Sequence, residues 1–150
     1  MPVGCALIWM PQWTSPSMAE LTRGLLDTSV VVDHDVIDPA LLPDESAIAA
    51  VTLAELAAGP HATTDERERG RRQDRLLWAA ATWDALPFDT EAARAYGRVF
   101  AATRAAQRSS RARLADLLIA STAAANGLPL YTRNAADFVG LEEIVTVVAV

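Results

Sequence analysis

The chain has 150 residues, 51% of them hydrophobic and 21% charged, a composition that suits one compact domain with a sizeable core. Its formal net charge of −6 argues against broad electrostatic binding of nucleic acid, but it is compatible with a local basic patch. All 13 basic residues are arginines. The absence of lysine excludes a P-loop nucleotide site and a phosphoacceptor receiver domain, because both need a lysine.

Residues 1–20 differ from the rest of the chain. They are rich in Pro, Trp and Met without a sustained period, and Met18 stands directly before a well-patterned segment. We interpret them as a poorly ordered N-terminal extension or the result of a misplaced start codon, and we place the domain at residues 21–150. Their apolar run is too short for a bilayer span and lacks a basic flank, so neither a signal peptide nor a membrane anchor is expected. Because the lone Cys5 can form no disulfide within the chain, we expect a cytoplasmic protein.

Two βα units are predicted in the first part of the domain. Residues 24–27 form a short buried strand that ends at Asp27 and leads into a turn and helix start. Residues 47–51 form a second strand, after which Thr52 caps a helix that ends near Gly59. The order of elements is typical of a parallel sheet.

The remainder of the chain continues the alternation of strands and helices. Charges of alternating sign predict an exposed helix over residues 65–78, either solvated or facing a partner. The further elements expected are helices over 91–107 and 114–126, and strands over 86–88, 128–132 and 144–150. This pattern predicts an α/β fold, a three-layer sandwich with a mainly parallel central sheet flanked by helices.

Four acidic residues lie where this fold would place a ligand, outside the carboxyl ends of the strands. Asp27 ends one strand, Glu55 and Asp137 follow two others, and Asp116 starts a helix that can face the same crevice. Each adjoins an apolar run, where a carboxylate is costly unless something neutralises it. The set therefore points to a bound divalent cation.

Each of these carboxylates also has a purely structural interpretation. Asp27 can cap the helix that follows it, and Glu55 has the spacing of a capping box with the threonine three residues earlier. Asp116 lies early in a helix, where the macrodipole favours a negative charge, and Asp137 follows Asn134 at capping-box spacing. The structural interpretations explain the four residues less well when they are taken together, because all four fall where the fold places the crevice.

The order and the residue types of the acidic motifs resemble those of the PIN-domain ribonucleases, in particular the toxin component of VapBC-type toxin–antitoxin pairs. The motifs occupy residues 26–29, 52–56, 114–120 and 130–138, and the resemblance covers residues 25–150. It implies a PIN-like fold and an endoribonuclease toxin that depends on Mg²⁺ or Mn²⁺. It also implies a homodimer that a cognate VapB-type antitoxin holds inactive.

The same resemblance implies roles for the four carboxylates. Asp27 and Asp116 would be the principal metal ligands, while Glu55 and Asp137 would complete the catalytic pocket directly or through water. A divalent ion held by such oxygen ligands can activate water and relieve the charge on a phosphodiester. RNA hydrolysis is the reaction expected of this pocket.

Supporting roles fall to neighbouring polar residues. Ser29 can hold a metal-bound water or a carboxylate oxygen, and Asn134 can orient the last carboxylate or touch a phosphate, although simple capping explains both. Arg111 and Arg113 either bind substrate phosphate or are solvated. The antitoxin is expected on the helices between residues 52 and 83, whose leucines and tryptophans are either docking anchors or core.

Two other functions stay open. A non-catalytic PIN-like interaction module would not need all four acids, yet all four are present. A phosphatase with Asp27 as its nucleophile needs a lysine and a second carboxylate two residues later, where this chain has Ser29.

Overall fold

A five-stranded parallel sheet organises the residues that the computed structural model describes, 22–106 and 114–150. The strands, in spatial order, are β3 (Ala85–Leu86), β2 (Glu45–Ala49), β1 (Arg23–Leu26), β4 (Leu130–Thr132) and β5 (Val147–Ala149). Every neighbouring pair is parallel, which confirms the predicted fold class. The expectations for residues 1–20, Arg111 and Arg113 lie outside the described residues.

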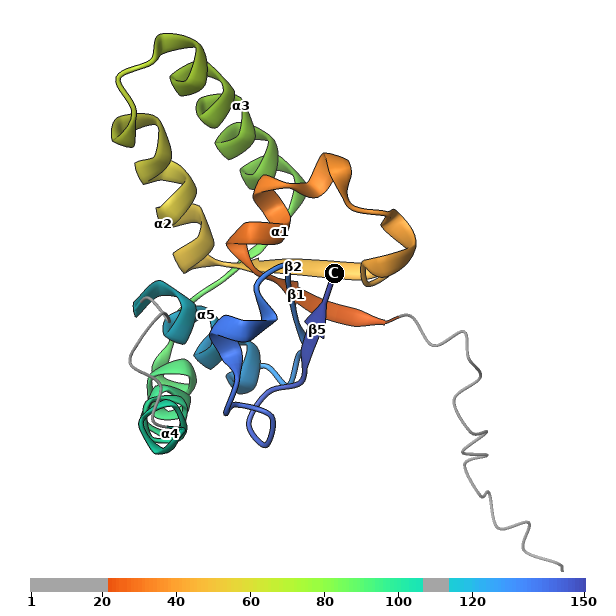
Figure 1. The fold of residues 1–150 in the computed structure, drawn as a ribbon, viewed down its shortest axis with the longest axis vertical. Helices are drawn as coiled ribbons and strands as arrows, with labels where there is room; N and C mark the ends of the chain where they lie inside the picture. Colours follow the sequence, from red (N-terminus) through yellow and green to blue (C-terminus); the bar gives the residue numbers. More distant parts are fainter. Residues whose placement is uncertain (1–21, 107–113) are drawn as a thin grey trace, which may run out of the picture.

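Helices cover both faces of this sheet. Helices α1 (Thr28–Val32), α2 (Ala50–Ala58) and α3 (Glu66–Thr82) lie on one side, and α4 (Thr90–Ala105) and α5 (Leu114–Ala125) lie on the other, as Figure 1 shows. Nowhere in residues 22–106 and 114–150 is a helix long and apolar enough to cross a membrane.

The central strand β1 contributes to both halves of the core. Leu25 packs in the cluster that contains Val99 of α4 and Ile119 of α5, whereas Leu26 packs with Val30 of α1 and Ile48 of β2. Successive side chains of a strand point to opposite faces, so a strand covered on both faces must be apolar throughout. This explains why the first strand reads as a short continuous apolar run.

The prediction that Thr52 caps the second helix is wrong. The strand β2 ends at Ala49 and α2 begins at once at Ala50, so Ala49 occupies the N-cap position. Thr52 is instead fully buried inside the helix. Since it is not the cap residue, the capping-box interpretation of Glu55 fails with it.

Two further details differ from the expectation. The last strand is confined to Val147–Ala149, because Ile144 and Val145 donate backbone hydrogen bonds to Leu141 in a turn. From its helical spacing with Leu117, Leu118 and Ser121 we expected Leu114 on the apolar face of α5, but it lies at the start of that helix and is 62% exposed. The other expected elements are present with shifted bounds. The elements β1, β3 and α4 start one residue earlier than predicted, and β2 starts two residues earlier. The strand β4 starts two residues later, and α3 continues to Thr82.

Most of the leucines and tryptophans expected either to dock a partner or to form core pack in or against one core cluster, but Leu76, Trp78 and Trp83 are only partly buried there. Leu56 is buried, and Trp78 and Trp83 pack edge to face against each other with ring centroids 4.8 Å apart. His34, in the short 3₁₀ helix η1 (His34–Val36), lies against both indole rings. Only Leu77 among these side chains is largely exposed, at 59%.

The end of α5 depends on a glycine. Gly127 has φ of +63°, and the backbone N–H groups of Gly127 and Leu128 donate to the carbonyls of Ala124 and Ala123. This is the Schellman arrangement, in which a left-handed residue lets the chain turn back and satisfy the last carbonyls of a helix. The turn directs the chain into β4 and thus to the edge where Asp137 lies.

Replacing Gly127 by Ala should lower the free energy of unfolding by about 1–2 kcal/mol, because a left-handed conformation is costly for a residue with a Cβ. The matched control is Gly97→Ala in the interior of α4, where a Cβ meets no atom within 4 Å. That change should raise stability by about 0.5–1 kcal/mol. Urea denaturation measures both, and a shift of the same sign in the two variants would contradict the assignment of the helix end.

Candidate active site

The predicted acidic residues meet at the carboxyl edge of the sheet. From β1 the chain passes to β2 on one side, whereas β4 lies on the other side, and such a switch point forms a crevice in an open parallel sheet. One open pocket of about 500 Å³ lies there. Its wall includes all four predicted carboxylates and both supporting residues: Asp27, Glu55, Asp116, Asp137, Ser29 and Asn134.

Asp27 is the most buried of these residues, at 4% exposed. It occupies the N-cap position of α1, but its side chain makes no capping hydrogen bond. Its Oδ2 instead accepts from Ser29 Oγ and from Thr132 Oγ1, both at 2.8 Å. The capping interpretation of Asp27 is therefore wrong, and the expected contact between Ser29 and an Asp27 oxygen is confirmed.

Backbone groups after β4 orient the two hydroxyls. The N–H of Arg133 donates to Ser29 Oγ at 3.1 Å, and the N–H of Asn134 donates to Thr132 Oγ1 at 3.0 Å. Each hydroxyl thus accepts from the backbone and gives its only proton to the carboxylate. Both bonds fall on Oδ2, so within the described residues Oδ1 is left for a ligand in the pocket.

Thr132 is a site residue that the sequence analysis missed. It ends β4, and because Leu26 pairs with Tyr131, Thr132 stands level with Asp27 on the neighbouring strand. The residue is fully buried, as a polar side chain with a committed partner can be. The pairing of β1 with β4 was the signal needed to find it, and a single sequence does not supply that register.

Glu55 is held from α1 rather than by its own helix. Thr28 Oγ1 donates to Glu55 Oε2 and lies 3.2 Å from Thr52 Oγ1. This contact ties the start of α1 to α2 and aims the glutamate at the pocket. Glu55 therefore belongs to the pocket by a tertiary contact, which no local spacing shows.

The remaining two carboxylates are partly exposed at the pocket wall. Asp116 lies in the first turn of α5, where the helix N-terminus favours a negative charge, so the dipole interpretation and the pocket position both hold. Asn134 precedes the short 3₁₀ helix η4 (Ala135–Phe138), but its side chain makes no capping bond. The capping-box interpretation of Asn134 and Asp137 is therefore wrong.

The donor types in the pocket suit a hard divalent cation. Carboxylate, hydroxyl and amide oxygens are the ligands that Mg²⁺ and Mn²⁺ prefer. Within residues 22–106 and 114–150, no group of three or more His, Cys, Asp or Glu side chains could hold a metal ion as it stands. Since Mg²⁺ usually keeps several waters and takes only one or two carboxylates directly, a wide acidic pocket still fits such an ion.

Comparison with known proteins gives concordant matches. The sequence pattern of the PIN domain matches residues 24–140. Ribonuclease VapC5 of Mycobacterium tuberculosis (strain ATCC 25618 / H37Rv) is 38% identical over 122 residues, which cover 79% of this chain and 87% of that protein. Ribonuclease VapC8 of the CDC 1551 / Oshkosh strain is 36% identical over 105 residues, which cover 69% and 93%.

A solved structure agrees with these relatives. The crystal structure of VapBC-5 from Mycobacterium tuberculosis, described as a member of the VapBC family of toxin–antitoxin systems, matches with a TM-score of 0.76 and 37% identity. The match covers 86% of this chain and 99% of that one.

Thr132→Val should lower the free energy of unfolding by about 1.5–3 kcal/mol at neutral pH, because it removes a hydrogen bond to a buried charged group. The loss should shrink in an Asp27→Asn background, where the charge is absent. Thr103→Val is the matched control, since its hydroxyl bonds only a carbonyl of its own helix, Val99 O at 2.8 Å. Equal losses of stability in Thr132→Val and Thr103→Val would show that the hydrogen bond to Asp27 stabilises the fold no more than a bond to a backbone carbonyl does.

Proposed function

The chain belongs to the PIN-domain family, and on this premise we propose that it is the ribonuclease toxin of a toxin–antitoxin pair. Two relatives at 36% identity or more carry the name ribonuclease, and the solved structure at 37% identity comes from a toxin–antitoxin system. One observation in the structure carries the proposal. Four carboxylates from four separate segments, Asp27, Glu55, Asp116 and Asp137, line a single pocket.

The reaction we propose is hydrolysis of RNA phosphodiester bonds with Mg²⁺ or Mn²⁺. Asp27 and Asp116 would hold the ion, with Glu55 and Asp137 completing the acidic wall. A bound ion would supply an activated water and would offset the negative charge of the reacting phosphate.

The chain's own residues prepare this site. Ser29 and Thr132 fix one oxygen of Asp27, so the carboxylate does not need to reorient when a ligand arrives. Thr28 restrains Glu55 in the same way by donating a hydrogen bond to its Oε2. Such fixed side chains lower the cost of assembling a catalytic geometry.

The partner we propose is a small VapB-type antitoxin. A basic side chain from such a partner could enter the acidic pocket and form charge-assisted hydrogen bonds with the carboxylates. It would compete with the metal for the same oxygens. A homodimer is also proposed, on the family resemblance alone.

Purified chain should cleave RNA in the presence of Mg²⁺ or Mn²⁺, and Asp27→Asn should reduce the rate by about a hundredfold or more, because charge stabilisation by a metal site supplies several kcal/mol. Asp84→Asn is the matched control, an exposed aspartate outside the pocket with the same change of charge. A gel assay with end-labelled RNA, with and without chelator, measures the rates. Cleavage that survives in Asp27→Asn would assign the activity to a contaminant or to another site.

Expression of the chain alone should arrest growth, and co-expression with the product of the adjacent small reading frame should relieve the arrest. The two proteins should co-purify, and inhibition should weaken as Mg²⁺ rises, because both ligands need the same carboxylates. Growth assays and affinity purification provide the measurement. If no neighbouring product binds and the chain causes no arrest, the toxin assignment is removed while a nuclease activity can still stand.

A further inference from the structure

The acidic pocket continues into a second hollow, of about 440 Å³, on the side of α3. The two share three wall residues, Thr28, Val32 and Glu55. The wall of the second hollow also carries three arginines of α3, Arg71, Arg72 and Arg75. We propose that this arginine hollow binds a phosphate of the RNA strand next to the one that is cleaved, an inference that rests on the proposed ribonuclease function.

Charge is the first reason for this assignment. The acidic pocket is lined by five carboxylates, Asp33 in addition to the four described above, in a chain of net charge −6. A polyanion approaching that pocket needs compensating positive charge close by. Helix α3 holds five of the 13 arginines against three acidic residues, and three of the five line the hollow that adjoins the acidic pocket.

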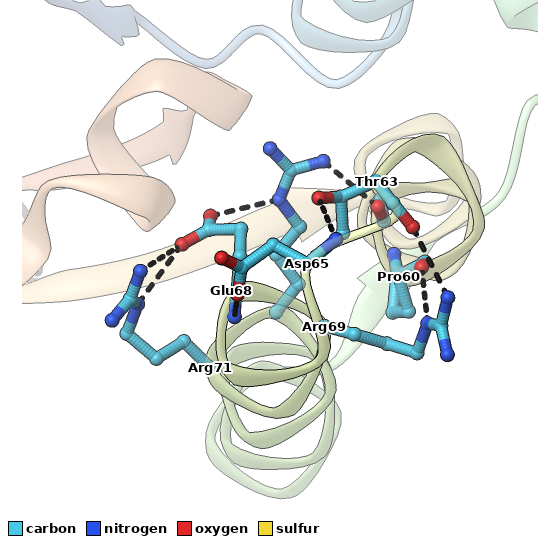
Figure 2. A network of polar contacts seen from close by, with 8 residues as sticks. Pro60, Thr63, Asp65, Glu68, Arg69 and Arg71 are labelled. Carbon is cyan, nitrogen blue, oxygen red and sulfur yellow. Dashed lines mark hydrogen bonds and ion pairs between the residues drawn. The ribbon is translucent and has the colours of Figure 1, made fainter.

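Two of the arginines are held in place without losing all their donors. Arg72 donates from Nε to Glu68 Oε1 and from Nη1 to the Gly59 carbonyl, both at 2.9 Å. Arg71 donates to Glu68 Oε2 from Nε and Nη2, as Figure 2 shows. A guanidinium has five N–H donors, so each retains three for a phosphate. Hydrogen bonds from Arg71 and Arg72 also hold the pKa of Glu68 below its ordinary value, so this carboxylate stays charged to a lower pH than a free glutamate would.

Arg75, the third arginine of the hollow, is fixed in a similar way. Its Nη2 lies 2.5 Å from Asp35 Oδ2, and its guanidinium stacks over the Trp78 ring at 4.8 Å from the centroid. Only 24% of its side chain is exposed. Arg71, by contrast, is 65% exposed and pairs only with Glu68, so it can be changed with little structural consequence.

An acidic protein segment could also use these arginines. The contiguity of the hollow with the four carboxylates favours RNA, because a strand with one phosphate in the acidic pocket must place a neighbouring phosphate nearby. The variant Arg71→Gln tests the choice. Its matched control is Arg98→Gln on α4, an exposed arginine on the opposite face of the sheet with the same change of charge.

The experiment measures the affinity of a single-stranded RNA oligonucleotide at several salt concentrations, in full-length chain that carries Asp27→Asn to prevent cleavage. The slope of log affinity against log salt should be less steep by about 0.7 in Arg71→Gln. Over a tenfold rise in salt, the Asp27→Asn protein that retains Arg71 should therefore lose about fivefold more affinity than the same protein with Arg71→Gln. Arg98→Gln should leave the slope unchanged, and Arg71→Lys should restore most of it. In the active chain, Arg71→Gln should raise KM more than it lowers kcat.

Equal slopes for Arg71→Gln and Arg98→Gln would overturn the inference, even if the active chain cleaves RNA as proposed. An Arg71-dependent slope in a chain that never cleaves would retain the phosphate site and remove the nuclease proposal. If Arg71→Gln weakens only the binding of the antitoxin and leaves the RNA slope intact, the hollow belongs to the protein partner and the inference is wrong. Melting curves check that each variant is folded.

Discussion

The buried carboxylate of Asp27 is the constraint on which the site depends. It stands at the end of the central strand, 4% exposed, where a charge without partners is costly. Two hydroxyls, from Ser29 and Thr132, satisfy one of its oxygens, and backbone N–H groups of the following loop orient both hydroxyls. The polar groups of two adjacent strand ends are thus committed to hold a single carboxylate oxygen.

The topology explains how distant parts of the chain reach this carboxylate. Because every strand runs in the same direction, every connection from a strand to a helix leaves from one edge of the sheet. Segments after β1, β2 and β4 therefore meet there, and α5 adds the start of its first turn. The helices α2 and α3 extend outward from the same edge, as Figure 1 shows. Three arginines of α3 line the hollow beside the acidic pocket.

The sequence was sufficient for the fold class and for the four carboxylates of the pocket, because apolar runs located the strands and the acids followed them. It failed where tertiary contact decides the role of a side chain. The spacing of Thr52 and Glu55 indicated a capping box, but β2 ends at Ala49 and this residue is the N-cap of α2. Thr132 was missed because its contact with Asp27 depends on the pairing of two strands more than a hundred residues apart.

The central claim is that the four carboxylates form one divalent-cation site. Thermal unfolding with increasing Mg²⁺ or Mn²⁺ tests it directly, since a ligand that binds only the folded state adds about 2.7 kcal/mol at a hundred times its Kd. We predict that the parent chain and Asp84→Asn gain this stability and that Asp27→Asn and Asp116→Asn lose most of the gain. A metal-induced shift of the same size in all four proteins would contradict the claim.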